Sequence, residues 1–479
     1  MTAPRAASST ASSARSGATP ARAAALAALS ERRRRNARMR DLLRSSSALA
    51  TLSERDRAQA CRLALGCVAA QGELDRVIDA HLSPGVHLEP RVRDALELAS
   101  FELLYLSTPD AVCVSQGVEL VRSVSPRAAG LANAVLHRIA EKDVAELAAA
   151  QMRVDAGTGD ASDMARVGGL PEWLCERALA SLGRDRALAW ARGALEPSCA
   201  SVAVNRAVYT SAEAEQLLVA AGCEPEPGPL VGSFVLGHPS SLAKSGLVED
   251  VVVLPCDLAA QEVVLVAAPK PRARVLEVGQ GRGTKTILLE GASVASGGPC
   301  EIVAVEIDAN KSALASRRME AAGIAEHVRC CVADGCKLGE SRGQGLPSEP
   351  AEPIVPAGHL EPAIQPALAG TFDVVFVDAP CSGTGTTRRH PELAWSLTPE
   401  NTNSCVHLEL ELLHAASACL APEGVLIYST CSLLVEEDEE VVDAFLLSPE
   451  GEAFVCERAE RTTQGSDIHF YARLRRREL

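Results

Sequence analysis

The sequence predicts a multidomain protein with an all-α domain, a small α+β connecting module and a doubly wound α/β domain, in that order along 479 residues. A chain of this length exceeds one hydrophobic core, since domains typically hold about 100–200 residues. Apolar residues recur at spacings of three and four across residues 21–149, which is the period of amphipathic helices. After Arg272, short apolar runs that end in Gly or Asp alternate with helical stretches, which indicates a mostly parallel sheet.

The N-terminal segment, residues 1–20, is expected to be a disordered basic arm. The first 44 residues contain ten arginines and only two acidic residues, in a background rich in Ala and Ser. Such a composition is typical of a disordered arm, of the start of a helix, or of an organelle transit peptide. We favour an arm that runs into a helix near Pro20, with the transit peptide as the alternative.

The first half of the chain then divides into three parts. Residues 21–149 form the all-α domain, and residues 150–169, which are small, polar and rich in glycine, are interpreted as a linker. The small α+β module covers residues 170–250. Its expected elements are two helices, one strand and a further helix: Glu172–Leu182, Asp185–Leu195, Ser201–Asn205 and Ala212–Ala221.

The doubly wound domain is expected over residues 251–479. Its strands are five apolar runs, at 273–279, 301–308, 328–334, 372–380 and 424–432. A long helix should begin near Thr398, an N-cap hydroxyl that is followed by proline at the first helical position. Residues 339–370 contain many prolines and little apolar periodicity, and we interpret them as a flexible insertion.

The bulk composition excludes several classes of protein. Sixteen cysteines are scattered through a long chain without a secretory signal, so a reducing compartment is favoured over a disulfide scaffold. No apolar run approaches the roughly 18–20 residues of a membrane span, and no cysteine pair with histidine partners stands at zinc spacing. We therefore expect a cytoplasmic monomer with no membrane segment and no metal.

A cofactor site is predicted where the strands of the last domain end. The loop between the first strand and its helix reads G-x-G-x-G from Gly279 to Gly283, which lets a ligand approach the backbone. The acid spacing of a dinucleotide site is not met. Instead, each of the next three strands ends in an acidic residue, which is the layout of class I, Rossmann-like S-adenosylmethionine methyltransferases. The predicted cofactor is S-adenosylmethionine, and the predicted contacts are Gly279, Gln280, Gly281, Arg282, Gly283, Thr284, Lys285, Glu306, Asp334 and Asp378.

Two thiols stand at the same edge of the predicted sheet. Cys381 follows the fourth strand and Cys431 follows the fifth, so both should face the cofactor. An isolated buried cysteine is more often a small apolar residue than a reactive one. The repeated position after neighbouring strands favours a functional pair.

The stretches DAPCSGTGTTRRHPELAW (378–395) and YSTCSLLVEEDEEVV (428–442) resemble the Fmu/Sun family of RNA (cytosine-5)-methyltransferases. Residues 21–142, with LALGCV and LANAVLHRIAE, resemble the NusB-like RNA-binding domain found in that family. The resemblance covers most of the chain. It implies an S-adenosylmethionine-dependent RNA (cytosine-5)-methyltransferase, with ribosomal RNA as its expected partner.

The resemblance also implies roles for individual residues. Cys431 would be the nucleophile and Cys381 would assist product release, while Asp378 is placed to hydrogen-bond the cytosine edge. A thiolate suits this task, because its addition to carbon 6 makes carbon 5 of cytosine nucleophilic. The glycine loop departs from the family's usual D-x-C-A-A-P-G-G-K-T, although Lys285 and Thr286 keep their places.

Arg388 and Arg389 follow the first thiol motif and are predicted RNA-phosphate contacts, the alternative being a solvated basic turn. Three other functions remain open at the level of sequence. One is a small-molecule or exocyclic-amine methyltransferase, which needs no thiol. Another is a NusB-like RNA-binding or assembly protein with a degenerate methylase domain. The third is a methyltransferase that acts on another RNA.

Overall fold

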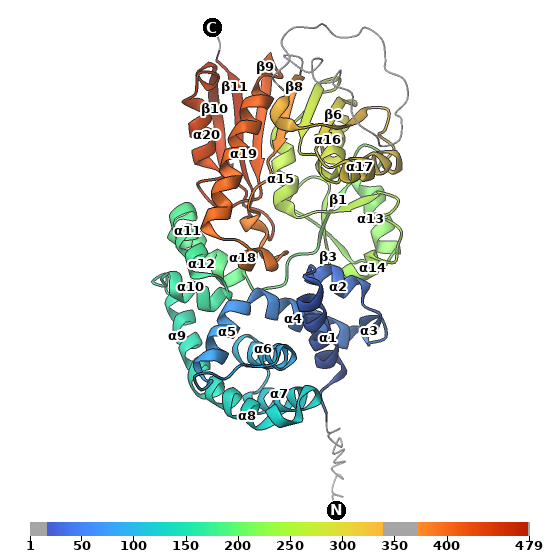
Figure 1. Ribbon diagram of the computed structural model, residues 1–479. Helices are drawn as coiled ribbons and strands as arrows, with labels where there is room; N and C mark the ends of the chain where they lie inside the picture. Colours follow the sequence, from blue (N-terminus) through green and yellow to red (C-terminus); the bar gives the residue numbers. More distant parts are fainter. Residues whose placement is uncertain (1–16, 339–371, 478–479) are drawn as a thin grey trace, which may run out of the picture. The chain divides into compact units, whose positions relative to one another are not determined.

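The computed structural model describes residues 17–338 and 372–477. The expected arm at 1–20 lies almost wholly outside the described residues, and so does the expected insertion at 339–370. The chain divides into two compact units (Figure 1). One consists of Met1–Cys175 with Trp190–Leu195, and the other of Glu176–Ala189 with Glu196–Leu479.

The first unit is helical over its described residues. Helix α1 begins at Pro20, as predicted, with proline at the start of the helix, where its missing N–H group has no cost. The α-helices of this part are α1 Pro20–Arg35, α2 Met39–Ser45, α3 Ser47–Ala50, α4 Glu54–Ala69, α5 Gln71–Ala80, α6 Pro90–Tyr105, α7 Asp110–Val124, α8 Ala129–Arg138, α9 Val144–Asp155 and α10 Ala161–Gly168.

The core of the first unit forms around α6, whose side chains are buried on most of its surface. Helix α4 packs closely on it, because Gly66 has no Cβ and leaves room for the ring of Phe101. Two arginines of α1 compensate buried carboxylates of α6: Arg22 Nε lies 2.6 Å from Glu102 Oε2, and Arg33 Nη2 lies 2.7 Å from Asp94 Oδ1. Removing one partner of such a pair leaves a buried charge without compensation, which strongly destabilises a fold.

The structure differs from the predicted linker at 150–169. Helix α9 continues to Asp155, and α10 begins directly after Asp160, whose side chain accepts a hydrogen bond from Asp163 N in a reciprocal capping arrangement. Arg153 Nε donates to Asp163 Oδ2 at 2.9 Å and ties the two helices together. The small polar residues that suggested a linker are therefore capping residues and a tight turn.

The smaller sheet of the second unit is antiparallel, in the order β2-β3-β1-β4. Its strand β1 was predicted, as were the helices at 172–182, 184–193 and 211–220, but the short helix at 239–242 and the three short partner strands were not. The elements are α11 Glu172–Leu182, α12 Arg184–Gly193, β1 Ser201–Val204, α13 Ser211–Ala220, β2 Pro225–Pro227, β3 Ser233–Leu236, α14 Pro239–Leu242 and β4 Val253–Pro255.

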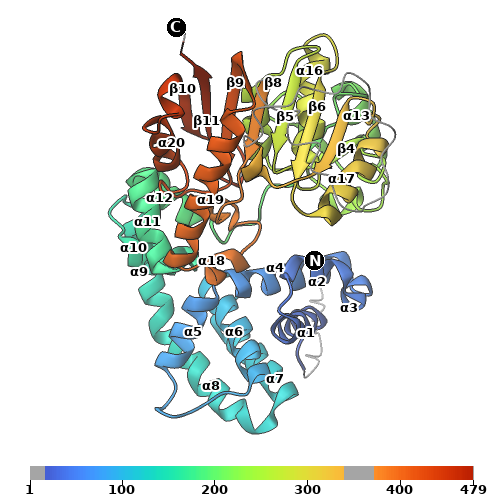
Figure 2. The ribbon, with the colours of Figure 1, turned by 45° about the horizontal axis from the view of Figure 1, so that its top comes forward.

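The larger sheet has seven strands in the order β10-β11-β9-β8-β5-β6-β7, which lie side by side in Figure 2. The five strands from β9 to β7 are parallel, whereas β11 and β10 are added in antiparallel fashion. The strands are β5 Arg274–Val278, β6 Glu301–Glu306, β7 Val328–Val332, β8 Phe372–Asp378, β9 Leu420–Thr430, β10 Phe454–Arg461 and β11 Phe470–Arg476. All five predicted strands are confirmed.

Helices cover both faces of this sheet, as in a doubly wound fold. Alternate residues of each strand point to opposite faces, so Val275 packs with one set of helices and Leu276 with the other. The helices are α15 Leu258–Ala267, α16 Thr284–Ala295 and α17 Ala309–Ala321 on one face, and α19 Pro399–Ser417 and α20 Glu439–Leu446 on the other. Thr398 caps α19 through Asn401 N, as predicted.

The topology fixes where a ligand can bind. Connections from β5 run to β6 on one side, while β8 lies on the other side of β5, so the winding direction reverses between β5 and β8. At such a reversal, the loops that follow two neighbouring parallel strands run in opposite directions. Ligands bind in the crevice that opens between these loops. The carboxyl ends of β5 and β8 carry the glycine loop and Asp378.

Candidate active site

The glycine loop after β5 has the geometry of a ligand cradle. Gly279, Gly281 and Gly283 all have positive φ, at 87°, 58° and 75°. A Cβ at Gly279 would lie 2.3 Å from the backbone oxygen of Asp378, so this position requires glycine. A Cβ at Gly281 would meet no atom of the described chain within 4 Å, which leaves space beside the loop.

Three carboxylates stand at the carboxyl ends of β6, β7 and β8. Glu306, at the end of β6, accepts a hydrogen bond from Gly281 N at 2.8 Å and another from Asp308 N at 3.0 Å. Asp334 follows β7, is half-buried, and accepts from Cys336 N at 3.0 Å. Asp378 ends β8 and accepts from Lys285 Nζ at 2.6 Å. The structure thus brings together the acids that the sequence placed at successive strand ends.

Lys285 belongs to the first turn of α16 and points at Asp378. Burial lowers the pKa of Lys285, but the Asp378 carboxylate outweighs burial and the net shift is upward. The ammonium group therefore stays charged at neutral pH, as a buried amine does only when a carboxylate faces it. This places one positive charge at the centre of the site.

The remaining loop residues contribute differently. The side chain of Gln280 is buried and donates to Cys330 Sγ at 3.1 Å, while its backbone N–H donates to Val305 O at 3.1 Å. Arg282 is exposed. Arg318 of α17 donates to the Arg282 carbonyl oxygen at 3.2 Å and to Thr284 Oγ1 at 2.8 Å, which fixes the loop against that helix.

The two thiols lie next to each other. Strands β8 and β9 are parallel neighbours that pair Val377 with Tyr428, so the loops that follow them start at the same level. Cys381 Sγ and Cys431 Sγ are 3.4 Å apart, and Cys431 N donates to Cys381 Sγ at 3.3 Å. The sequence placed both thiols at one edge of the sheet, and the structure brings them into contact.

The contact makes the two thiols unequal. The hydrogen bond from Cys381 lowers the pKa of Cys431, with help from the Lys285 charge and against the opposing effects of burial and Asp378. The same hydrogen bond raises the pKa of Cys381 well above its usual value, and burial adds to the shift. The shared proton thus favours Cys381, and Cys431 is the thiol of the pair that more readily forms the thiolate, the reactive form of cysteine.

The two arginines of the motif after Cys381 are already engaged. Arg388 donates to the backbone oxygens of Glu196 and Pro197, at 3.0 and 2.8 Å. Arg389 Nε donates to Oδ2 of the buried Asp467 at 2.6 Å. This ion pair favours a structural role for Arg389, and a phosphate contact remains a prediction for the exposed side of Arg388.

Sequence reasoning missed two kinds of residue around the site. Ile307 is 70% exposed in the structure. The signal available in the sequence was an apolar residue flanked by two acids, Glu306 and Asp308. Glu437 and Asp438 are fully buried, although they stand in the acidic run Glu436–Glu440, which looks like a solvated surface. No signal in the sequence marks these two as buried.

Glu277 is predicted to make the free energy of unfolding depend on pH. It is fully buried behind the glycine loop, accepts from Thr286 Oγ1 at 2.5 Å, and its Oε1 has no partner among the described residues. Burial raises the pKa of Glu277 to about 8, against the opposing hydrogen bond from Thr286. The native state therefore holds this proton more tightly than the unfolded chain, so its contribution to the free energy of unfolding is lost as pH rises from about 4.5 to about 8.

We expect Glu277→Gln to remove this dependence, because the amide is neutral at every pH and can still accept from Thr286. Chemical unfolding of both proteins between about pH 4.5 and pH 7 should show the variant gaining up to about 3 kcal/mol on the wild type. Other buried acids act equally in both proteins and cancel in the difference. Parallel stability curves would contradict the assignment of a neutral Glu277.

Within residues 17–338 and 372–477, no group of three or more His, Cys, Asp or Glu side chains is arranged to hold a metal ion. No helix in the same ranges combines the length and apolar character that crossing a membrane requires.

Comparisons with known proteins identify families and relatives that this chain resembles. The family model described as 16S rRNA methyltransferase RsmB/F matches residues 264–473, and the NusB family model matches residues 19–141. The chain is 30% identical over 394 residues to ribosomal RNA small subunit methyltransferase B of Thermus thermophilus, covering 82% of this chain and 79% of that protein. It is 29% identical to the protein of the same name from Xylella fastidiosa strain Temecula1, with 81% of each covered.

Solved structures share the fold. The crystal structure of PH0851 superposes with a TM-score of 0.70 at 21% identity, over 96% of this chain and 100% of that one. The structure of NSun6 from Pyrococcus horikoshii with SFG gives a TM-score of 0.52 at 16% identity, over 65% of this chain and 100% of that one.

Proposed function

The chain belongs to the RsmB/F family of 16S rRNA methyltransferases, and from this premise we propose that it methylates carbon 5 of a cytosine in small-subunit ribosomal RNA. The observation that carries the proposal is the contact between Cys381 and Cys431 beside the Lys285–Asp378 pair. A methyltransferase that acts on an oxygen or an amine needs no thiol. A thiol is needed where one group must attack a ring carbon and later leave it, and a second thiol beside it can assist that departure.

S-adenosylmethionine is the methyl donor, and it supplies an electrophilic methyl group when bound. The residues at the switch point fit it. The space beside Gly281 admits the ligand to the loop, the carboxylate of Glu306 offers acceptors for ribose hydroxyls, and Ile307 offers an apolar surface for the adenine ring. Asp334 and Lys285 complete the proposed contacts, with Gly279, Gln280, Arg282, Gly283, Thr284 and Asp378 around them.

We assign the attack to the Cys431 thiolate. Its sulfur forms a bond to carbon 6 of the cytosine, and the electron pair of the 5,6 double bond becomes available at carbon 5. Asp378 hydrogen-bonds the polar edge of the ring during this step, which requires a base that is unstacked from its neighbours. Lys285 keeps a positive charge close to both groups.

Product release reverses the attack. Once the Cys431 sulfur is bonded to carbon 6, it no longer shares a proton with Cys381, so Cys381 can release its own proton to water. Carbon 5, which then carries both a methyl group and a proton, loses that proton to the Cys381 thiolate or directly to water. The electron pair of that C–H bond restores the double bond, and the bond between Cys431 and carbon 6 breaks to return the thiolate. We assign assistance in this step to Cys381, because its sulfur lies beside the attacking one.

The alternative functions are less well supported. An exocyclic-amine methyltransferase would leave the thiol contact without a use. A degenerate methylase would be expected to lose the acids or the thiols, whereas Glu306, Asp334, Asp378 and both cysteines stand together at one edge of the sheet. A different RNA substrate remains compatible with the same chemistry.

The function is tested by bisulfite sequencing of ribosomal RNA from cells with and without the gene. Cytosines methylated on carbon 5 resist deamination, so one position in small-subunit RNA should be protected only when the protein is present. Re-expression of the wild type should restore protection. Identical protection in both cell lines at all ribosomal positions would overturn the proposed substrate.

A further inference from the structure

A buried carboxylate joins the two loops that carry the thiols. Glu437, six residues after Cys431, is fully buried and accepts two hydrogen bonds from Ser382, the residue after Cys381. Ser382 N lies 2.7 Å from Oε1 and Ser382 Oγ lies 2.5 Å from Oε2. The Glu437 side chain thus fixes both hydrogen-bond donors of Ser382.

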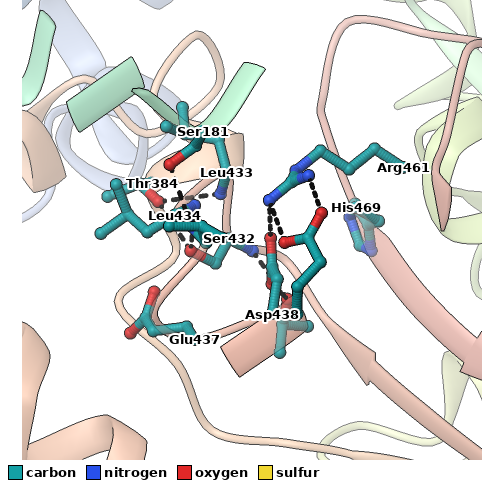
Figure 3. Close-up of polar contacts among 12 residues, drawn as sticks. Ser181, Thr384, Ser432, Leu433, Leu434, Glu437, Asp438, Arg461 and His469 are labelled. Atoms are coloured by element: carbon teal, nitrogen blue, oxygen red, sulfur yellow. Dashed lines mark hydrogen bonds and ion pairs between the residues drawn. The ribbon is translucent and has the colours of Figure 1, made fainter. Parts of the chain in front are cut away.

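Hydroxyl groups extend this connection. Ser382 Oγ contacts Thr384 Oγ1 at 3.1 Å, and Thr384 Oγ1 in turn contacts Ser432 Oγ at 3.1 Å and accepts from Leu433 N at 3.1 Å. Figure 3 shows Thr384, Ser432 and Leu433 converging in this way. The immediate neighbours of both cysteines, Ser382 and Ser432, therefore belong to one buried network.

Backbone contacts also hold the two thiol-bearing loops closely together. Gly385 N donates to the carbonyl oxygen of Cys431 at 3.0 Å, and a Cβ at Gly385 would lie 1.9 Å from the carbonyl oxygen of Ile468. Tyr428 donates to the backbone oxygen of Glu437 at 2.6 Å, which anchors the segment after β9 to the strand itself. The position of Cys381 relative to Cys431 is thus set by these contacts.

The surroundings of Glu437 are unfavourable for a carboxylate without a specific task. Glu409 and Cys405 of α19 face it, and burial together with the neighbouring Glu437 and Asp438 raises the pKa of Glu409 to about 9. Asp438 is compensated by Arg461 Nη2 at 3.0 Å. Buried carboxyl groups placed together cost free energy, and they persist where their hydrogen bonds define a structure.

We propose that Glu437 is a positioning residue for the thiol pair: by holding Ser382, it keeps Cys381 Sγ within hydrogen-bonding distance of Cys431 Sγ. It touches neither cofactor nor substrate in this assignment and acts through Cys381. The inference rests on the proposed function for its role in methylation, but the geometry it claims can be measured without RNA.

The test is the pH dependence of alkylation of Cys431 by iodoacetamide in the full-length protein, followed by peptide mass spectrometry from about pH 6 to about pH 10. The titratable groups that face Cys431 are Cys381, Asp378, Lys285, Asp467 and, from α19, Glu409. Glu437→Ala leaves these side chains in place. It removes the support of the Cys381 loop and also the Glu437 charge, which raises the pKa of Cys381. Loss of one hydrogen bond to a thiolate should move the midpoint upward by about one pH unit, so that alkylation near neutral pH becomes about tenfold slower.

Three further variants make the test specific. Glu437→Gln retains an acceptor for Ser382 N and should restore most of the wild-type midpoint. Glu440→Ala removes an exposed acid of the same run and should change nothing. Ser382→Ala removes the hydroxyl that links Glu437 to Thr384 and should shift the midpoint in the same direction as Glu437→Ala. If Glu437→Ala does not fold, the midpoint of Ser382→Ala decides whether the inference holds.

Calorimetric titration with S-adenosylmethionine reports whether each variant is folded, since the cofactor contacts are untouched. A Glu437→Ala protein that binds the cofactor normally and keeps the wild-type alkylation profile would overturn the inference, while the proposed function would stand. A wild type that methylates no RNA would overturn the function, while the alkylation profiles would still decide the role of Glu437.

Discussion

Replacing Cys431 by alanine is expected to abolish methyl transfer, with a loss of roughly a thousandfold or more, because the sulfur proposed to form the bond to carbon 6 is removed. Cys381 and Lys285 lower the pKa of Cys431, which supports the assignment of this thiol as the nucleophile. The variant should bind S-adenosylmethionine as the wild type does. Transfer of labelled methyl groups to RNA measures the loss.

Cys456→Ala is the matched control, because this half-buried thiol lies on β10 and its pKa is raised by burial. It should retain full activity. If Cys431→Ala remained active and Cys381→Ala did not, the two roles would have to be exchanged. Equal activity of all three variants would exclude a thiol mechanism.

Replacing Cys381 by alanine should instead trap the enzyme on its substrate. Attack by Cys431 and transfer of the methyl group remain possible, but elimination slows when the sulfur beside the reacting carbon is removed. A denaturation-resistant complex with ordinary RNA should therefore accumulate, visible as a shifted band on a denaturing gel. The same band should be absent from the Cys381→Ala, Cys431→Ala double variant.

Cys381→Ala should also change the response to pH. Without the hydrogen bond at 3.4 Å, the pKa of Cys431 rises toward its usual value. Formation of the trapped complex should then require a higher pH than methyl transfer by the wild type, by about one unit. A complex that forms at the same pH in both would show that Cys381 does not support the thiolate.

The parts of the site that could be predicted from sequence are those that follow a strand directly. The glycine loop, Glu306, Asp334, Asp378 and the two thiols each stand within a few residues of an apolar run, and parallel strands bring their carboxyl ends to one edge. The period of the apolar residues was therefore enough to place them together. The 3.4 Å contact between the thiols depends on the pairing of β8 with β9, which no local pattern specifies.

Other parts depend on tertiary contacts and were missed. The antiparallel strands β10 and β11 mix charged and apolar residues without a regular period. Their charged side chains pair across the hairpin, as Arg473 does with Glu457, so the two strands resemble a charged surface. The acidic run Glu436–Glu440 also looks like a charged surface in the sequence. In the structure, however, Glu437 is buried by the loop after Cys381, whereas Glu440 is exposed. Burial of a charge is decided by its partners, and Ser382 lies 55 residues away in sequence.

Mapping the covalent bond between the protein and RNA that contains 5-fluorocytosine tests the central claim most directly. The fluorine on carbon 5 cannot leave as the proton does, so the adduct formed by the attacking sulfur persists through digestion. Tandem mass spectrometry should find the nucleotide on the peptide that contains Cys431 and nowhere else. A nucleotide on the Cys381 peptide, or active enzyme with no adduct at all, would contradict the account.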